Sequence, residues 1–233
     1  MISTHWSQRR AKHKRNWFRA LRTDTKIPSS LPVRVDELNR LLSDSAPEDV
    51  LKNDRTTTVA CVTLGDRKVV LKRYNPRNQW HKVKRALRKS RARRCWDMSY
   101  VFQKAGLNVS PPLLMLEDRL GPFRRNAFFV NEKLQGKELL DELPKMSEPD
   151  RQKVKQAITE AFAKMKRARI VHGDMKATNL LWVNDELFFI DLDASERHGP
   201  WSLTWTANHN KDKKRFVRNW EDTPEVAALF SNL

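Results

Sequence analysis

The stretch His172-Gly173-Asp174-Met175-Lys176-Ala177-Thr178-Asn179, followed by Ile190-Asp191-Leu192-Asp193, decides the fold of this chain. It contains an aspartate, an asparagine five residues later and, beyond a short apolar region, a second aspartate. An aspartate in a loop can orient and deprotonate a hydroxyl group, whereas the later asparagine and aspartate offer the hard oxygen ligands that Mg²⁺ prefers. The order and spacing therefore predict a phosphotransfer site.

Each position has its own expected role. Asp174 is the candidate catalytic base, and Lys176 is placed to neutralise charge on the transferred phosphoryl group. Asn179 and Asp191 are the candidate metal ligands, and Lys72, late in an apolar strand, can reach nucleotide phosphates. Phosphoryl transfer requires positioning and charge compensation rather than covalent chemistry, and these residue types supply both. The alternatives are a structural Asp–Asn capping arrangement or a fold that has lost activity.

The composition indicates a folded protein that stays in the cytoplasm. The chain has 233 residues and eight Trp, and it contains no run of 18 or more apolar residues that would predict a transmembrane helix. Its N-terminus lacks the apolar stretch of a secretory signal. The two cysteines, Cys61 and Cys95, are far apart, so we expect reduced cysteines in the core rather than a metal site or a disulfide framework.

The net charge of +18 is concentrated in two blocks. Residues 1–22 carry seven Lys/Arg and residues 81–94 carry eight, and neither block contains an acid. Such blocks favour a polyanionic partner, namely nucleic acid, an anionic membrane surface or a phosphorylated glycolipid. The alternative is that each block is simply a solvated basic helix face.

The N-terminal half reads as a basic segment followed by strands and a helix. Residues 1–30 show a weak helical pattern of aromatic and apolar residues, suited to a membrane surface or to the protein's own body. A short helix is expected over 34–42, and strands over 57–64 and 68–74 with a turn at Gly65-Asp66. A long helical region is expected from about 80 to 105, ending at Gly106.

The C-terminal half reads as strands followed by helices and a late hairpin. Strands are expected at 113–116 and 126–134. Ser147 is the expected N-cap of a helix that ends near Arg169 and has five apolar residues on one face: Val154, Ile158, Ala161, Phe162 and Met165. The remaining expected elements are a hairpin over 180–183 and 187–190, a basic helix over 211–220 and a last helix from Thr223. This order predicts an α+β protein with a basic segment (1–30), an N-lobe (31–134) and a C-lobe (135–233).

The run from His172 to Asn179, with Ile190 to Asp193, resembles the protein-kinase-like superfamily. Within that superfamily it resembles the bacterial lipopolysaccharide core kinases, which phosphorylate heptose or 3-deoxy-manno-octulosonic acid (Kdo). The resemblance covers roughly residues 50–220, and three further segments support it: Val70-Leu71-Lys72-Arg73-Tyr74, Gly106-Leu107-Asn108-Val109-Ser110-Pro111-Pro112 and Arg215-Phe216-Val217-Arg218-Asn219-Trp220.

The resemblance implies a two-lobe protein-kinase-like fold, with a small β-rich N-lobe, a reduced helical C-lobe and an ATP site between them. Lys72 would bind the α- and β-phosphates, and Glu132 and Leu134 would pair with adenine through backbone groups. Asp174 would be the catalytic base, with Asn179 and Asp191 binding Mg²⁺. Asp193 stands where kinases usually carry a glycine.

The sequence departs from the kinase pattern in two ways. It has no G-x-G-x-x-G, so the turn at Asn53-Asp54-Arg55-Thr56 would have to cover the phosphates with its amides and the Arg55 side chain. The helix expected after Lys72 contains no glutamate, and Asp97 is the only acid between Lys72 and Glu117. We therefore expect Asp97 to pair with Lys72, unless the usual lysine–carboxylate pair is absent.

The expected substrate is an anionic glycolipid. Only 42 residues follow Asp191, which argues against the extended segments that bind a peptide substrate. A lipopolysaccharide precursor in the inner leaflet suits the basic blocks, which would hold the enzyme at the periphery of the inner membrane. Nucleic acid is a less favoured partner. The alternatives are a kinase for another small molecule, and a non-catalytic pseudokinase or polyanion-binding protein.

Overall fold

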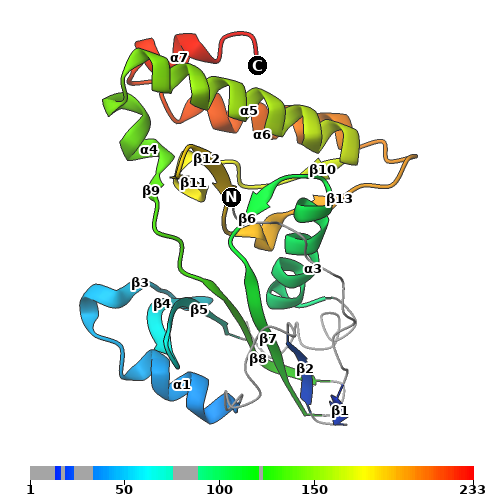
Figure 1. Ribbon diagram of the computed structural model, residues 1–233. Helices are drawn as coiled ribbons and strands as arrows, with labels where there is room; N and C mark the ends of the chain where they lie inside the picture. Colours follow the sequence, from blue (N-terminus) through cyan, green and yellow to red (C-terminus); the bar gives the residue numbers. More distant parts are fainter. Residues whose placement is uncertain (1–13, 17–18, 24–33, 76–88, 121–122) are drawn as a thin grey trace. The chain divides into compact units, whose positions relative to one another are not determined.

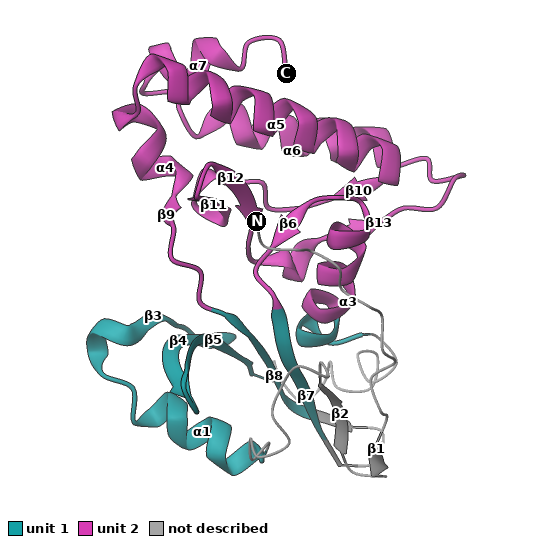
Figure 2. Cartoon of the chain, in the orientation of Figure 1, with its two compact units in different colours: residues 1–93, 112–132 teal, residues 94–111, 133–233 magenta. Residues whose placement is uncertain are grey.

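The computed structural model describes residues 14–16, 19–23, 34–75, 89–120 and 123–233. The chain divides into two compact units, which Figure 2 distinguishes by colour. Unit 1 comprises residues 1–93 and 112–132, and unit 2 comprises residues 94–111 and 133–233. Residues 94–111 thus group with the C-terminal residues, whereas the lobe boundaries drawn from the sequence stay a prediction.

Unit 1 is built on an antiparallel sheet with the strand order β1-β2-β7-β8-β5-β4-β3 (Figure 1). The strands expected at 57–64 and 68–74 are confirmed, and Gly65 adopts a positive φ of 66° in the turn between them. The expected short helix is confirmed as α1. The elements of this unit are β1 Lys14–Asn16, β2 Arg19–Thr23, α1 Val35–Ser43, η1 Pro47–Asp49, β3 Val50–Asn53, β4 Thr57–Leu64, β5 Arg67–Tyr74, β7 Pro112–Leu120 and β8 Phe123–Glu132.

One face of this sheet forms the core of unit 1. Val69 and Leu71 of β5 are buried in a cluster that includes Leu38 of α1. Because side chains alternate along a strand, Lys72 lies on the opposite face, where it is half-buried. β5 pairs with β4 on one side and with β8 on the other, so Lys72 sits on a fully paired inner strand.

The helical pattern expected across the N-terminal segment is wrong for the part that the structure describes. Residues 14–16 and 19–23 form strands β1 and β2. β2 pairs antiparallel with β7, with Leu21 opposite Leu116, so pairing with a sheet edge overrides a weak helical periodicity. The rest of the basic segment and residues 81–88 of the second basic block lie outside the described residues.

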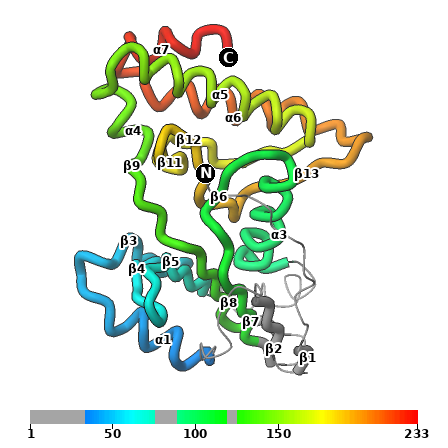
Figure 3. Tube along the Cα trace, in the orientation of Figure 1, coloured from blue at the N-terminus to red at the C-terminus, as the bar shows by residue number. Residues whose placement is uncertain are grey.

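Unit 2 contains most of the helices. Its two sheets have the orders β6-β12-β11-β9 and β10-β13. Figure 3 traces α5 beside α6, and the ring of Phe162 lies 6.0 Å from that of Phe216. Its elements are α3 Arg91–Lys104, β6 Asn108–Val109, β9 Lys137–Glu138, α4 Leu139–Glu142, η3 Leu143–Lys145, α5 Glu148–Ala168, β10 Ile170–Val171, η4 Ala177–Asn179, β11 Leu180–Val183, β12 Glu186–Phe189, η5 Leu192–Ala194, β13 Glu196–Arg197, α6 Trp205–Arg218 and α7 Pro224–Leu229.

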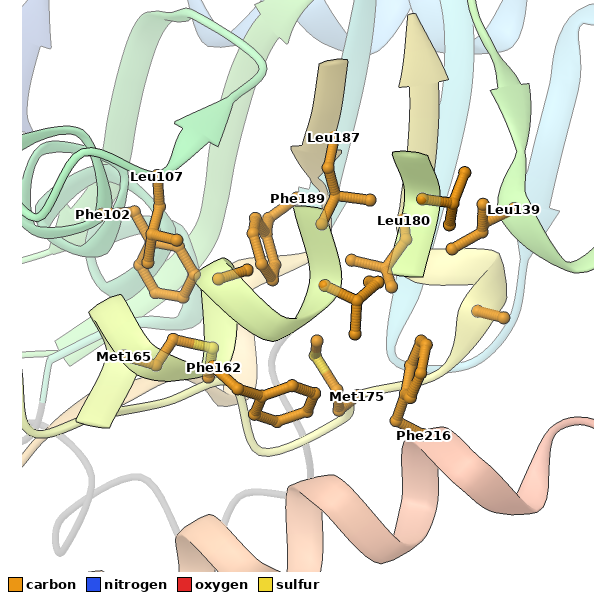
Figure 4. Packing of buried hydrophobic residues seen from close by; sticks show 14 of the residues in the cluster. Phe102, Leu107, Leu139, Phe162, Met165, Met175, Leu180, Leu187, Phe189 and Phe216 are labelled. Atoms are coloured by element: carbon orange, nitrogen blue, oxygen red, sulfur yellow. The ribbon is translucent and has the colours of Figure 1, made fainter. Parts of the chain in front are cut away.

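Helix α5 forms the centre of the unit 2 core, as its sequence pattern predicts. Its N-cap is Ser147, whose side chain accepts a hydrogen bond from the amide of Asp150, and its C-cap Arg169 is left-handed with a φ of 53°. The five residues expected on one face are all buried. Figure 4 shows Phe162 and Met165 of this face packed among side chains from other elements, including Phe102, Phe189 and Phe216.

The hairpin and helix α6 of unit 2 both lead to the site. The expected hairpin is confirmed as β11 and β12, and its turn residues Asn184 and Asp185 have φ values of 49° and 61°, as a two-residue type I′ turn requires. Helix α6 begins at Trp205, six residues before the start expected from the sequence. The periodicity is weak there, but His209 is buried and stacks on Trp205 at 5.3 Å, which extends the helix.

The expected core position of the two cysteines is confirmed. Cys61 and Cys95 are both buried, and they do not form a disulfide. None of the described helices is both long enough and apolar enough to cross a bilayer.

Candidate active site

Gly173 fixes the conformation of the loop that carries Asp174. The loop leaves strand β10 at His172, and Gly173 has a positive φ of 81°. A Cβ at this position would lie 2.5 Å from the carbonyl oxygen of Ala194. Both the dihedral angle and the close approach therefore require glycine between His172 and Asp174.

The structure brings Asp174 and Asn179 together. Asn179 Nδ2 donates to the backbone carbonyl of Asp174 at 2.8 Å and to its carboxylate Oδ2 at 3.3 Å. The donor end of the amide is thereby turned toward Asp174, and the acceptor Oδ1 is the atom of Asn179 suited to a cation. The spacing of five residues thus has a direct structural purpose, which is to close this loop on itself.

Asp191 comes directly after Ile190, which contacts the loop that carries Asp174 and Asn179. The amide of Ile190 donates to the carbonyl of Asn179 at 3.0 Å, and Asp191 then adopts a left-handed conformation with a φ of 57°. Among the described residues, no group of three or more His, Cys, Asp or Glu could hold a metal ion. The oxygens of Asn179 and Asp191 nevertheless fit Mg²⁺, which binds few protein ligands and takes its remaining ligands from water and phosphate.

Asp212, a residue that the sequence interpretation missed, holds the loop from helix α6. Its carboxylate accepts hydrogen bonds from the amide of His172 at 2.7 Å and from the amide of Gly173 at 3.1 and 3.2 Å. The side chain is buried, and burial raises the pKa of Asp212, opposed by the amide of Gly173 and by His172. A buried carboxylate forty residues from its partners gives no local sequence signal.

Arg215, one turn further along α6, contacts the carboxylate of Asp174 itself. Its Nη1 lies 2.5 Å from Asp174 Oδ1 and donates to the carbonyl of Gly173 at 3.3 Å. Lys176 Nζ lies 3.7 Å from the other carboxylate oxygen, Oδ2. Two cations thus flank Asp174. Asp212 and Arg215 share a face of α6 because they are three residues apart, but this spacing does not point to Asp174.

His172 is a buried neutral side chain rather than a second base. Its Nε2 lies 3.1 Å from the carbonyl of Ile190, and its ring lies among those of Phe102 and Phe189. Burial lowers the pKa of His172. Its Nδ1 has no hydrogen-bond partner among the described residues, so Nε2 carries the proton and donates to Ile190. The histidine therefore links the loop of Asp174 to the strand that leads into Asp191.

The residues expected to bind nucleotide lie on several elements. Lys72 is on β5, Glu132 ends β8, Leu134 follows β8, and Asp97 lies on α3. Their roles stay predictions.

A buried acid on the sheet is a second candidate partner for Lys72. In the strand register, Lys72 lies opposite Phe129, and Phe129 lies opposite Met115, so the three side chains share one face of the sheet. Glu117 lies two residues after Met115 on the same strand, so its side chain is on that face too. Glu117 is only 1% exposed. Sequence reasoning considered only the helix after Lys72 and so overlooked a carboxylate on the sheet.

The turn expected to cover the phosphates is organised differently from the expectation. Asp54 Oδ1 accepts hydrogen bonds from the hydroxyl of Thr56 at 2.8 Å, from the amide of Thr56 at 2.7 Å and from the amide of Thr57 at 2.8 Å. The hydroxyl of Thr56, followed by its amide, lowers the pKa of Asp54. The amide of Asp54 donates to the carbonyl of Thr57. The expectation that the turn binds phosphates through its amides is therefore wrong for the amides of Asp54 and Thr56. The rest of that expectation, including the role of the Arg55 side chain, stays a prediction.

Asp193 is buried, and its backbone carbonyl accepts a hydrogen bond from Arg94 Nη1 at 3.2 Å. The short helix η5 that contains it follows directly after Asp191. Asp193, which stands where kinases usually carry a glycine, thus helps to hold the segment after Asp191 against helix α3.

The fold is that of a protein-kinase-like enzyme. A solved structure entitled "WaaP in complex with acyl carrier protein" matches with a TM-score of 0.62 and 16% sequence identity, covering 90% of this chain and 95% of that one. No curated protein matches the chain. The model of the lipopolysaccharide kinase (Kdo/WaaP) family matches residues 46–227, and the chain belongs to that family.

Replacing Arg215 by alanine should lower kcat about 10–100-fold, because the carboxylate of Asp174 loses the group that fixes its orientation. Steady-state kinetics with ATP and a lipopolysaccharide acceptor measure the effect. Arg218→Ala is the matched control, because Arg218 is on the same helix but pairs with Glu221, and it should stay within about twofold of the parent. An Arg215→Ala enzyme with parental kcat would remove Arg215 from the site.

Replacing His172 by glutamine should make the free energy of unfolding fall less as the pH is lowered. Because burial lowers the pKa of His172 below its usual 6.5, protonation favours the unfolded state, and the free energy of unfolding falls as the pH drops below 6.5. Urea denaturation between about pH 7 and about pH 5 should show a shallower decline in His172→Gln, which keeps a donor toward Ile190. Parallel declines in the two proteins would show that His172 does not titrate on unfolding.

Proposed function

We propose that this protein transfers the γ-phosphate of ATP to a hydroxyl of a heptose or Kdo sugar in the lipopolysaccharide inner core. The proposal rests mainly on the contacts of Asp174, whose backbone and carboxylate are held by Asn179 while Arg215 and Lys176 flank the carboxylate. Membership of the lipopolysaccharide kinase family supports the reaction class.

In the proposed reaction the sugar hydroxyl attacks the γ-phosphorus and its proton passes to Asp174. A bond forms between the sugar oxygen and phosphorus, the bond between phosphorus and the bridging oxygen of ATP breaks, and ADP leaves. Arg215 orients the carboxylate, and Lys176 is close enough to offset charge on the phosphoryl oxygens. Positioning and charge compensation of this kind account for most of the catalysis in phosphoryl transfer.

Mg²⁺, when bound with ATP, would neutralise phosphate charge, and Asn179 and Asp191 are the residues proposed to hold it. The left-handed backbone of Asp191 supports this role, since non-glycine residues in that region concentrate at functional sites. Lys72, Glu132 and Leu134 remain the proposed nucleotide-binding residues, with Asp97 as the partner of Lys72.

The cations around Asp174 also bear on the acceptor. Arg215 and Lys176 are each more than a third exposed, so an acceptor that carries phosphate or carboxylate groups meets positive charge beside the base. Such an acceptor fits the phosphorylated, acidic sugars of the lipopolysaccharide core. A cationic acceptor, such as an aminoglycoside, would be disfavoured by the same charges.

Replacing Asp174 by asparagine should lower the transfer rate about 10²–10⁴-fold, because the residue can no longer accept the proton. The assay is transfer of phosphate from ATP to dephosphorylated core oligosaccharide, with the modified position mapped by mass spectrometry. Asp185→Asn, the same change on an exposed hairpin turn, is the control and should retain parental activity. Transfer that persisted in Asp174→Asn would exclude Asp174 as the base.

The partner of Lys72 can be identified by comparing two variants. If Asp97 pairs with Lys72, Asp97→Asn should raise the KM for ATP about tenfold and Glu117→Gln should not. The opposite result would assign the pair to the sheet, where Glu117 shares the face of Lys72. Parental kinetics in both variants would show that neither carboxylate orients the lysine.

A further inference from the structure

The loop between β13 and α6 exposes two large apolar side chains. Trp201 is 92% exposed and Leu203 is 98% exposed, although the flanking Trp205 stacks on the ring of His209. We call residues 199–204 the tip. Figure 1 shows this orange segment extending away from the helices of unit 2. Two neighbouring apolar side chains at such exposure indicate a binding surface rather than ordinary scatter.

The tip is an ordered turn. His198 enters it with its amide donating to the carbonyl of Arg169 at 2.9 Å. Within the tip, Ser202 Oγ lies 3.0 Å from His198 Nδ1, and the amide of Ser202 donates to the carbonyl of Gly199 at 3.2 Å. The chain leaves through Trp205, whose ring lies 5.5 Å below the Arg169 guanidinium. The fold therefore holds Trp201 and Leu203 outward.

The base of the tip carries more basic than acidic residues, although Glu196 of β13 is an exposed acid beside it. Residues 161–173, which include the end of α5, contain four Lys/Arg and no acid. Arg169 contacts both ends of the tip, and Lys166 and Lys213 are both close enough to His209 to lower its pKa, after the larger effect of burial. The one acid within α6, Asp212, is buried against the amides of the catalytic loop.

We propose that the tip inserts Trp201 and Leu203 into the interface of an anionic lipid bilayer, with the basic residues at its base facing the headgroups. This inference rests on the proposed function, because it assigns the surface by which the enzyme reaches a membrane-anchored acceptor. An indole is suited to the headgroup region, and each Lys/Arg near an anionic surface adds attraction.

The position of the tip matches the position of the acceptor. The tip and Asp174 lie at opposite ends of the paired strands β10 and β13. The tip follows β13 at the end next to Arg169, and Asp174 follows β10 at the end next to His172. Helix α6 then runs from Trp205 beside the tip to Arg215 beside Asp174, a rise of about 15 Å. Docking through the tip would thus leave Asp174 above the lipid surface, at the level of core sugars rather than of the lipid headgroups.

An acidic protein is the competing partner for a basic apolar surface. The geometry favours the bilayer, because a short projecting turn with one indole and one leucine inserts into a fluid interface without requiring a complementary pocket. A protein partner would more commonly meet a broader apolar patch with a polar rim.

Vesicle flotation tests the proposal with the full chain. The probes are vesicles of phosphatidylcholine alone and vesicles with equal parts of phosphatidylcholine and phosphatidylglycerol. The double variant Trp201→Ser with Leu203→Ser should bind the anionic vesicles about tenfold less than the parent. Leu51→Ser, at a 60% exposed leucine on β3, is the matched control and should bind as the parent does. The double variant Lys166→Glu with Arg167→Glu should bind the anionic vesicles more weakly than the parent does, and its binding to the phosphatidylcholine vesicles should be unchanged.

Undiminished vesicle binding by the double variant Trp201→Ser with Leu203→Ser would overturn the proposal. If that double variant kept its vesicle binding but lost binding to immobilised polyglutamate, the tip would be assigned to an acidic protein partner. Phosphorylation of lipid-free core oligosaccharide separates the two claims, because the double variant should keep the parental rate there and lose rate only on vesicle-embedded glycolipid. A parent without any transfer, but with tip-dependent vesicle binding, would refute the proposed function and leave this inference intact.

Discussion

The buried carboxylate of Asp212 is the interaction on which the candidate site depends. It accepts hydrogen bonds from the amide of the fully buried His172 and from the amide of Gly173. Leaving the buried amide of His172 unsatisfied would cost about 1–3 kcal/mol. The tight turn at Gly173 is therefore stable only while α6 supplies this carboxylate, and α6 in turn is held by its packing on α5.

The same helix connects the geometry of the loop to its chemistry. Arg215 is one turn from Asp212 and contacts Asp174, so a single rigid element sets both the backbone of the loop and the orientation of its carboxylate. Asn179 closes the loop from the other side, and His172 joins it to the strand that precedes Asp191. Positioning side chains on regular elements gives the precision that phosphoryl transfer requires.

Most of the fold follows from local sequence signals, and the candidate site follows only in part. The Ser147 cap, the apolar face of α5 and the Asn184-Asp185 turn are local features, so their elements were predictable. The pairing of β2 with β7 and the early start of α6 depend on distant contacts, and local periodicity missed both. Asp174 and Asn179 belong to one short motif, whereas Asp212 and Arg215 reach it from forty residues away and could be found only from the structure.

Hydrogen exchange at the amides of His172 and Gly173 tests most directly whether α6 holds the catalytic loop. The account predicts that both amides are strongly protected in the parent and exchange much faster in Asp212→Ala, while amides in the interior of α5 keep their protection. Equal protection of the two loop amides in parent and variant would contradict the account, because the loop would then be fixed without Asp212.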